Sequence, residues 1–307
     1  MGNKFKKFEI NNQRKILRTL DLLSIPTRKL YLNYYDKLLH ELDNVFKNTE
    51  ISYKNVELKD NYFLEKVWVM WWQGYDKAPD LIKSNIQRLR VIFGYDSVIV
   101  IDQNNYKKYT NISSELVDKL LQNKITFTFW SDIVRYNLLM NNGGMWIDST
   151  VIMSKMLKNH TDEFFRNDFF SLCNAKENYK FISLGKWTGW CIGGKRGFGL
   201  FKFVNCFFET YYDYYDEQID YFLVDDAVTY YYLHNGEFRK IVKEESSKWE
   251  PYLFIDNLTN TKTTELFSKF NTNKEYSIQK FTYKYRLDES IPKEALIYKL
   301  IDTNCID

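Results

Sequence analysis

Residues 142–150 join a glycine pair to a carboxylate and two hydroxyls in the order Asn-Gly-Gly-Met-Trp-Ile-Asp-Ser-Thr. The carboxylate is Asp148, and it directly follows a strand-forming run. It can accept hydrogen bonds from the ribose of a nucleotide diphosphate, while a divalent cation on oxygen ligands balances the diphosphate. The glycine pair would let the backbone come close to that ligand. The alternative is an aspartate that only caps a loop.

A second acidic and basic pair lies on a helix predicted over residues 128–141. Asp132 and Arg135 are three residues apart, so they share one face of that helix. From beside the apolar stripe that would pack on a sheet, their side chains can reach the strand ends and hydrogen-bond sugar hydroxyls. A local surface ion pair, worth about 0.2–0.5 kcal/mol, is the other interpretation.

The elements that must position these residues indicate an α/β fold. Strands are predicted at 67–72, 98–101 and 145–152, and helices at 79–94, 115–122 and 128–141. Strands that alternate with helices indicate parallel βαβ units. Ligands of such sheets bind beyond the carboxyl ends of the strands, where Trp71 and Asp148 would lie.

Residues 1–60 are predicted to be mainly helical, with an interruption at Pro26 and Thr27. They contain 12 Lys and Arg against 8 Asp and Glu. One interpretation is a solvated helical face. The other is contact with an anionic membrane surface, where each basic residue adds roughly 1 kcal/mol.

The composition argues against several classes of protein. A net charge of +3 is too small to indicate nucleic-acid binding. No apolar run approaches the ~20 residues of a membrane span, and the start lacks the apolar stretch of a signal peptide. The cysteines (Cys173, Cys191, Cys206 and Cys305) show no metal-binding or disulfide spacing, which fits a reducing compartment. We therefore expect a cytoplasmic protein.

Two motifs together resemble the signature of a known family. Ser131-Asp132-x-x-Arg135 followed by Gly143-Gly144-x-Trp146-x-Asp148-x-Thr150 is similar to the pattern of the bacterial capsular polysaccharide synthesis glycosyltransferases. Their wider relatives include sugar transferases with an Asp-x-Asp motif and the large glucosylating toxins. The likeness extends over about residues 66 to 285, with further matching segments at 71–74, 187–189, 220–225 and 280–284.

The resemblance implies a GT-A fold, a Rossmann-like core of nucleotide-diphospho-sugar transferases. This catalytic domain would span residues 61–307 and include a C-terminal acceptor-binding and closing region. Residues 1–60 would be a helical accessory segment. The donor would be a UDP-sugar, and the transferred sugar would retain its anomeric configuration. The sequence identifies no nucleophile, so front-face attack and double displacement both remain open.

The resemblance also implies roles for residues of the donor site. Trp71 would stack on the base, a contact worth about 1–3 kcal/mol, with Gln73 beside it. Asp132 and Arg135 would grip the donor sugar. Asp148 would contact the ribose and a Mn²⁺ or Mg²⁺ ion.

The metal motif departs from the wider pattern at one position. Thr150 stands where the wider family has a second Asp, which is normally the direct metal ligand. The expected metal site is therefore Asp148 with Thr150, and strict metal dependence stays open. Asp225 and Asp226, on a helix predicted over 221–233, either supply the missing ligand or face the acceptor or the anomeric carbon.

Residues from the second half of the chain complete the expected site. Lys280 and Lys284 are candidates for stabilising charge on the leaving diphosphate, and solvated surface lysines are the alternative. Trp187 and Trp190 are candidates for the acceptor side.

The resulting hypothesis is a retaining hexosyltransferase of surface polysaccharide assembly. It would move galactose or glucose from a UDP-sugar to a lipid-linked oligosaccharide, in the cytoplasm and with peripheral contact to the inner face of the membrane. A toxin-like transferase acting on a protein hydroxyl is the second hypothesis. A non-catalytic sugar-binding module that uses the abundant aromatic residues is the third.

Overall fold

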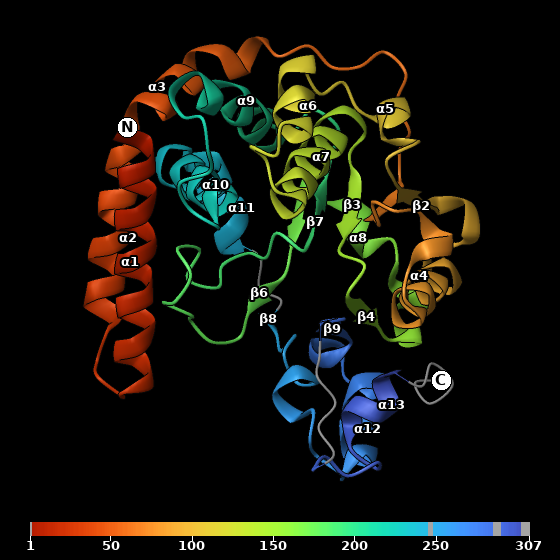
Figure 1. Ribbon diagram of the computed structural model, residues 1–307. Helices are drawn as coiled ribbons and strands as arrows, with labels where there is room; N and C mark the ends of the chain where they lie inside the picture. The colour runs from red at the N-terminus through yellow and green to blue at the C-terminus, as the bar shows by residue number, and fades with distance from the viewer. Residues whose placement is uncertain (1, 245–247, 285–289, 302–307) are drawn as a thin grey trace.

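The computed structural model, which describes residues 2–244, 248–284 and 290–301, is built on a mixed five-stranded sheet (Figure 1). The strand order is β2-β1-β3-β7-β5. These strands are β1 (Val67–Met70), β2 (Val98–Ile101), β3 (Gly144–Ile147), β5 (Phe169–Ser171) and β7 (Cys191–Gly194). β1 is parallel to both β2 and β3, whereas β7 is antiparallel to β3 and to β5. The predicted parallel units are thus confirmed for β1, β2 and β3, within a sheet that is mixed overall.

Helices connect the parallel strands close to where the sequence predicts them. They are α4 (Asp80–Phe93), α6 (Ser114–Leu121) and α7 (Phe127–Asn142). The short helix α5 (Tyr106–Tyr109), between β2 and α6, was not predicted. The side chain of Thr126 caps the start of α7 by accepting from the backbone N–H of Phe129. Since α7 leads directly into β3, its first half lies at the carboxyl ends of the parallel strands.

Two predicted strands are too long. The first ends at Met70 rather than at residue 72, because the chain turns and the N–H of Gly74 donates to the carbonyl of Trp71. The strand predicted over 145–152 is broken after Ile147. Its second part, β4 (Val151–Met153), leaves the main sheet and pairs antiparallel with β9 (Ile278–Lys280). The break places Asp148 in a turn, where its carbonyl accepts from the N–H of Val151.

Alternation along β1 decides which side of the sheet each helix covers. Val67 and Val69 pack in one apolar cluster with Ile82 and Ile86 of α4. Trp68, which points to the other face, packs in a second cluster with α7 and with α9 (Gly199–Tyr214). All three strand residues are fully buried, as expected for a sheet covered on both faces.

The expected role of the glycine pair is wrong. Gly143 and Gly144 have φ angles of +70° and +86° and lie at the amino end of β3, away from Asp148. A Cβ at Gly144 would lie 2.2 Å from the carbonyl oxygen of Lys66, and one at Gly143 would lie 2.6 Å from the backbone nitrogen of Arg196. The pair therefore admits neighbouring backbone rather than a ligand.

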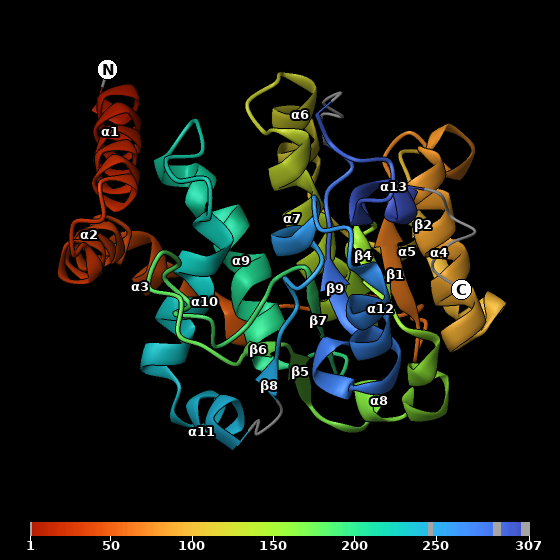
Figure 2. The ribbon, with the colours of Figure 1, turned by 90° about the horizontal axis from the view of Figure 1, so that it is seen from below.

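The N-terminal segment is helical, as predicted, and comprises α1 (Gly2–Leu22), α2 (Arg28–Glu41) and α3 (Asp43–Ser52). Figures 1 and 2 show α1 and α2 on the outside of the molecule, with α9 and α10 (Leu223–His234) between them and the sheet. Phe46 of α3 stacks on Phe207 of α9 and Tyr230 of α10, with ring centroids 5.3 and 4.2 Å away. The segment thus shares the apolar core of α9 and α10.

The C-terminal part lies below the sheet in Figure 1 and packs under β4. Its helices α12 (Thr263–Thr272) and α13 (Leu296–Ile301) enclose Phe254 and Phe270 against Ile152. The other elements are α8 (Glu163–Arg166), α11 (Gly236–Glu244) and the parallel pair β6 (Cys173–Asn174) and β8 (Lys248–Trp249). Short 3-10 helices lie at Tyr53–Asn55, Tyr75–Lys77, Tyr95–Ser97, Lys155–His160, Ile255–Asn257 and Lys274–Tyr276.

Among the described residues, no helix is both long and apolar enough to cross a bilayer. Cys173, Cys191 and Cys206 are buried free thiols, and Cys305 lies outside the described residues.

The Gly144→Ala substitution is expected to lower the free energy of unfolding by more than about 2 kcal/mol, because it adds a steric clash to a strained left-handed φ. Urea unfolding followed by circular dichroism measures the loss. The matched control is Gly236→Ala, whose Cβ would meet nothing closer than 3.7 Å. Equal stability of the two variants would contradict the role assigned to Gly144.

Candidate active site

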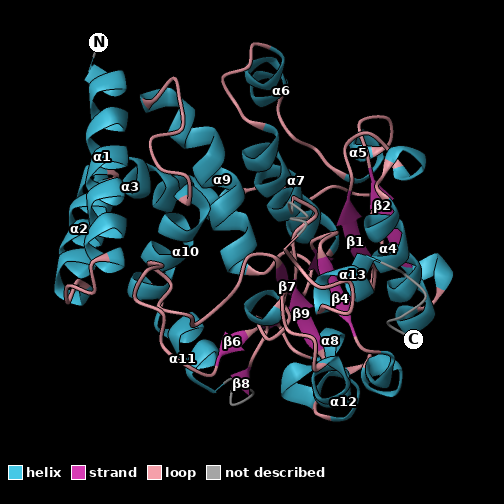
Figure 3. Ribbon diagram, turned by 60° about the horizontal axis from the view of Figure 1, so that its bottom comes forward, coloured by secondary structure: helices cyan, strands magenta, loops and turns pink. Residues whose placement is uncertain are grey.

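A cavity of about 680 Å³ opens at the carboxyl ends of β1 and β3. Most of its wall comes from four parts of the chain: the end of β1 with the loop after it, the start of α7, the turn after β3, and residues 280–284 at the end of β9. Tyr221 and Ile255 complete the wall. Figure 3 shows how β9 brings residues 280–284 beside β4 and next to the main sheet. The lining residues that the argument uses are Trp71, Gln73, Trp146, Asp148, Thr150, Lys280, Tyr283 and Lys284.

The Asp148 carboxylate is the most heavily bonded group of this cavity. Its Oδ1 accepts hydrogen bonds from Nη2 of Arg135 at 3.1 Å and from Nε1 of Trp146 at 2.8 Å. Its Oδ2 accepts from Nζ of Lys280 at 2.6 Å. The backbone N–H of Asp148 donates to the carbonyl of Trp190 at 2.9 Å, which fixes the turn after β3. These contacts exclude the interpretation that Asp148 only caps a loop.

Arg135 links Asp148 to Asp132. Its Nη1 donates to Oδ1 of Asp132 at 2.6 Å, and its guanidinium lies 4.9 Å from the ring centroid of Trp146. A Cβ on Gly189 would approach Nη1 to 3.2 Å, so a glycine there leaves room for the guanidinium. Asp132 and Arg135 are both buried, unlike a surface ion pair. The structure thus brings the carboxylates at 132 and 148 and the guanidinium at 135 together.

Burial and charge move the carboxyl pKa values in opposite directions. Burial raises the pKa of Asp132 to about 7, although Arg135 opposes the shift. Burial would also raise the pKa of Asp148, but the charges of Lys280 and Arg135 outweigh it and lower the pKa to about 2. At neutral pH Asp148 is therefore ionised, whereas Asp132 is close to its midpoint.

Asp225 and Asp226 point to different places from the first turn of α10. Oδ1 of Asp225 accepts from Nε1 of Trp187 at 3.3 Å, and burial raises the pKa of Asp225 to about 6 while Arg135 lowers it. Asp226 is buried and interacts with Asp220, which forms an ion pair with Arg14 of α1 at 2.5 Å. Neither residue is part of the described cavity wall, although Asp225 interacts with the charge of Arg135.

An aromatic pair forms one end of the cavity. Trp71 and Tyr283 meet edge to face, with ring centroids 5.2 Å apart. Nε1 of Trp71 is buried, and no described residue hydrogen-bonds it. Gln73 and Lys284 also line this end, and Nζ of Lys284 lies 5.6 Å from the Tyr283 ring. Sequence reasoning did not single out Tyr283, although its segment, 280–284, was part of the resemblance.

The described side chains around Asp148 offer a divalent cation few oxygen ligands, and an ammonium contacts the two that were expected. Mg²⁺ and Mn²⁺ prefer about six oxygen ligands. The expected pair supplies one carboxylate and the hydroxyl of Thr150, and no cluster of three or more His, Cys, Asp or Glu that could hold a metal occurs in residues 2–244, 248–284 and 290–301. In addition, Nζ of Lys280 lies 2.6 Å from Oδ2 of Asp148 and 2.9 Å from Oγ1 of Thr150. An ammonium thus bridges both expected ligands.

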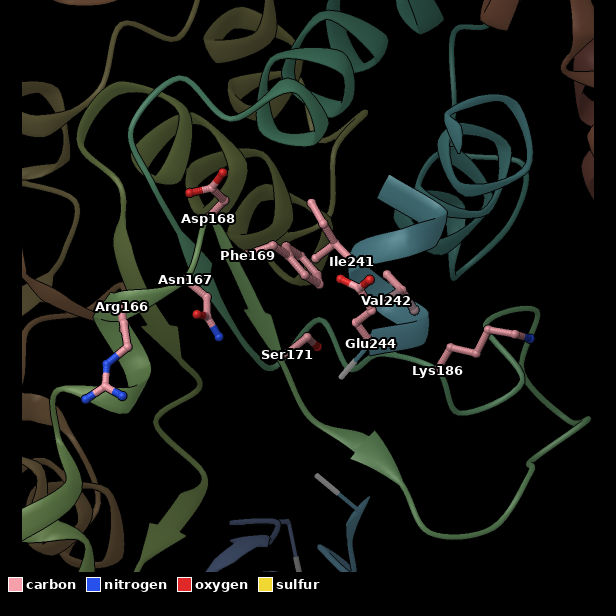
Figure 4. A pocket seen from close by; sticks show the side chains of 9 residues that line it. All are labelled: Arg166, Asn167, Asp168, Phe169, Ser171, Lys186, Ile241, Val242 and Glu244. Carbon is pink, nitrogen blue, oxygen red and sulfur yellow. The ribbon is translucent and has the colours of Figure 1, made fainter. Parts of the chain in front are cut away.

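A second cavity of about 340 Å³ lies beside β5 and α11 (Figure 4). Arg166 and Lys186 extend away from each other on its opposite sides, and Asp168 and Glu244 also lie in its wall. Its charged groups do not converge on one point, so this cavity lacks the arrangement that recognises an anionic ligand.

The comparison with protein families agrees with the resemblance. A family model described as capsular polysaccharide synthesis protein matches residues 25–300, nearly the whole chain. The chain belongs to this family. The match begins after α1 and includes every residue of the Asp148 cavity named above. No curated protein and no solved structure matches this capsular polysaccharide synthesis protein. Membership in the family indicates a role in capsule biosynthesis.

Between about pH 4 and pH 7, the free energy of unfolding is expected to fall as pH rises. The folded state keeps the proton of Asp132 up to its pKa of about 7, whereas the unfolded state releases it near the ordinary value of 3.8. Asp148 acts below that window, since its pKa of about 2 makes stability rise with pH up to about pH 4. Urea unfolding is measured between about pH 4 and pH 7. The free energy of unfolding should fall less steeply with pH in the Asp132→Asn variant than in the wild type.

The control for this experiment is Asp168→Asn, an exposed aspartate outside the Asp148 cavity. It should keep the wild-type slope. A wild-type slope in Asp132→Asn would show that Asp132 titrates normally.

Proposed function

We propose that this capsular polysaccharide synthesis protein is a retaining glycosyltransferase of GT-A type that transfers a hexose, galactose or glucose, from a UDP-sugar. One observation supports the proposal above all: the Asp148 carboxylate lies in the wall of a cavity beyond the carboxyl ends of parallel strands, and it is bound there by Lys280 and, from behind the wall, by Arg135. Ligands of α/β sheets bind in this position. The mixed order of the sheet, with β7 antiparallel beside β3, is compatible with a GT-A core.

The cavity wall carries aromatic, basic and acidic side chains at different places, and this arrangement supports an orientation for the donor. The aromatic end, formed by Trp71 and Tyr283, suits the uracil ring, because stacking on an aromatic side chain stabilises a base by about 1–3 kcal/mol. Lys280 and Lys284 follow and suit the diphosphate. The partly buried carboxylate of Asp148 offers hydrogen-bond acceptors to sugar hydroxyls, and Arg135 joins it to the buried carboxylate of Asp132 behind the cavity wall.

Asp225 is the candidate for the acceptor side. It lies within the electrostatic reach of Asp132 and Arg135, and Trp187 orients its carboxylate. Its pKa of about 6 makes it a group that can accept a proton near neutral pH. We propose that Asp225, rather than the buried Asp226, receives the proton of the acceptor hydroxyl.

The turn between α1 and α2 supports contact with a membrane, and through it a lipid-linked saccharide acceptor. Leu22 and Leu23 are 86% and 66% exposed there, and Ile25 is exposed as well. Arg18 and Lys29, also exposed, flank these apolar side chains. An apolar tip with basic neighbours favours an anionic bilayer over plain solvation. We therefore propose peripheral contact with the inner face of the cytoplasmic membrane.

UDP-glucose or UDP-galactose is expected to raise the melting temperature and to release UDP when a lipid-linked saccharide is added. Both assays are run with Mn²⁺, with Mg²⁺ and with EDTA. The Asp148→Asn substitution should lower turnover by about 100-fold or more, because it removes the charge that holds Arg135 and Lys280 in place.

Asp168→Asn serves again as the control and should turn over normally. Donor binding without any turnover would favour a sugar-binding module, and labelled sugar on protein would favour a toxin-like transferase. Absence of donor binding in all three ionic conditions would refute the proposed function.

The double substitution Leu22→Ser and Leu23→Ser is expected to weaken co-sedimentation with phosphatidylglycerol vesicles by at least about tenfold, since two apolar side chains no longer enter the bilayer. Leu121→Ser is the matched control, because Leu121 is 73% exposed on α6. Equal sedimentation of both variants, or none by the wild type, would refute contact through the turn.

A further inference from the structure

Lys280 is held as a structural part of the site rather than as a loose surface lysine. It lies on β9 opposite Val151 of β4, and its backbone N–H donates to the carbonyl of Pro251 at 2.8 Å. The next residue, Phe281, donates its N–H to the carbonyl of Thr150 at 3.0 Å. These backbone contacts place the ammonium beside the turn that contains Asp148, and only 21% of the Lys280 side chain is exposed.

The Lys280 ammonium and the Asp148 carboxylate both lie in the cavity wall. It contacts Oδ2 of Asp148 at 2.6 Å and Oγ1 of Thr150 at 2.9 Å, and its Nζ lies 5.5 Å from the ring centroid of Trp190. An ammonium has three N–H donors, and these two bonds use two of them within the described part of the chain. Because Lys280 also lines the cavity, the third N–H is available to an oxygen of a ligand there.

A diphosphate next to Asp148 requires a cation between the two, since like charges in a partly buried site repel strongly. A transferase with a second Asp at position 150 would bind a metal ion there. This chain has a threonine at that position, whose neutral hydroxyl accepts a hydrogen bond from Lys280. The exchange of a carboxylate for a hydroxyl removes one negative charge, and the site then needs a monovalent cation to remain balanced.

We propose that Lys280 takes the place of the divalent cation, so that this protein binds and uses its nucleotide sugar without metal. The inference rests on the proposed function and adds which cation stabilises the leaving diphosphate. During transfer, the bond between the sugar C1 and the β-phosphate oxygen breaks, and both electrons stay on that oxygen. The acceptor hydroxyl oxygen bonds to C1, and its proton goes to Asp225. The third N–H of Lys280 donates to the departing phosphate oxygen.

The first test measures UDP affinity by calorimetry in EDTA and in Mn²⁺, together with Mn²⁺ binding by electron paramagnetic resonance. We expect the same Kd for UDP in both conditions and no protein-bound Mn²⁺, with or without UDP. UDP binding that requires Mn²⁺ would overturn the inference and leave the proposed function intact. Absence of UDP binding in both conditions would refute the proposed function and the inference with it.

The second test compares Lys280→Met and Lys280→Arg in EDTA. Lys280→Met should lower turnover by about 100-fold or more, as expected when a donor to the leaving group is lost. Its affinity for UDP should fall by at least about tenfold. Lys280→Arg keeps a cation at this place and should recover most of the UDP affinity.

Lys274→Ala is the matched control, because Lys274 precedes β9 on the same segment and pairs with Glu163 outside the cavity. It should bind UDP like the wild type. Circular dichroism and melting temperature establish that each variant folds. If folded Lys280→Met binds UDP in EDTA as tightly as the wild type, Lys280 is not the required cation.

Discussion

The site depends on the ion-pair network around the Asp148 carboxylate. This one group accepts hydrogen bonds from Arg135 of α7, Trp146 of β3 and Lys280 of β9, and so joins the consecutive elements α7 and β3 to a strand that lies more than a hundred residues later in the chain. A partly buried carboxylate with these partners stays ionised, and removing one partner leaves a charge that is less well compensated. The network therefore constrains the turn after β3, the middle of α7 and the segment around β9 at the same time.

The same network separates the roles of the acidic residues. Lys280 and Arg135 lower the pKa of Asp148 to about 2. At Asp132 and Asp225 burial outweighs the nearby positive charge and raises the pKa values to about 7 and 6. Groups with pKa values pushed apart in one site can hold a charge and exchange a proton side by side. In the proposed transferase, Asp148 holds the cations, Asp132 binds Arg135 behind the cavity wall, and Asp225 accepts the proton.

The C-terminal segment contributes side chains to the cavity, and the N-terminal helices pack against the helices behind it. The C-terminal segment supplies Lys280, Tyr283 and Lys284 to the cavity, because β9 pairs with β4 directly after the Asp148 turn. The N-terminal helices share the core of α9 and α10, and Arg14 of α1 pairs with Asp220 just before α10. The family match begins at residue 25, so α1 and its exposed apolar end precede the part that the family model covers.

The sequence by itself determined the α/β class, the parallel strands β1, β2 and β3, and the segments that line the cavity, since these follow from local periodicity and from motifs of a few residues. It could not decide that the strand after Asp148 leaves the main sheet, that Gly144 faces the backbone of Lys66, or that Asp225 and Asp226 diverge. Lys280 remained one of two candidates for the same reason. Each of these outcomes depends on contacts between residues distant in the chain, and only the tertiary structure, through the pairing of β4 with β9, brings an ammonium to Asp148.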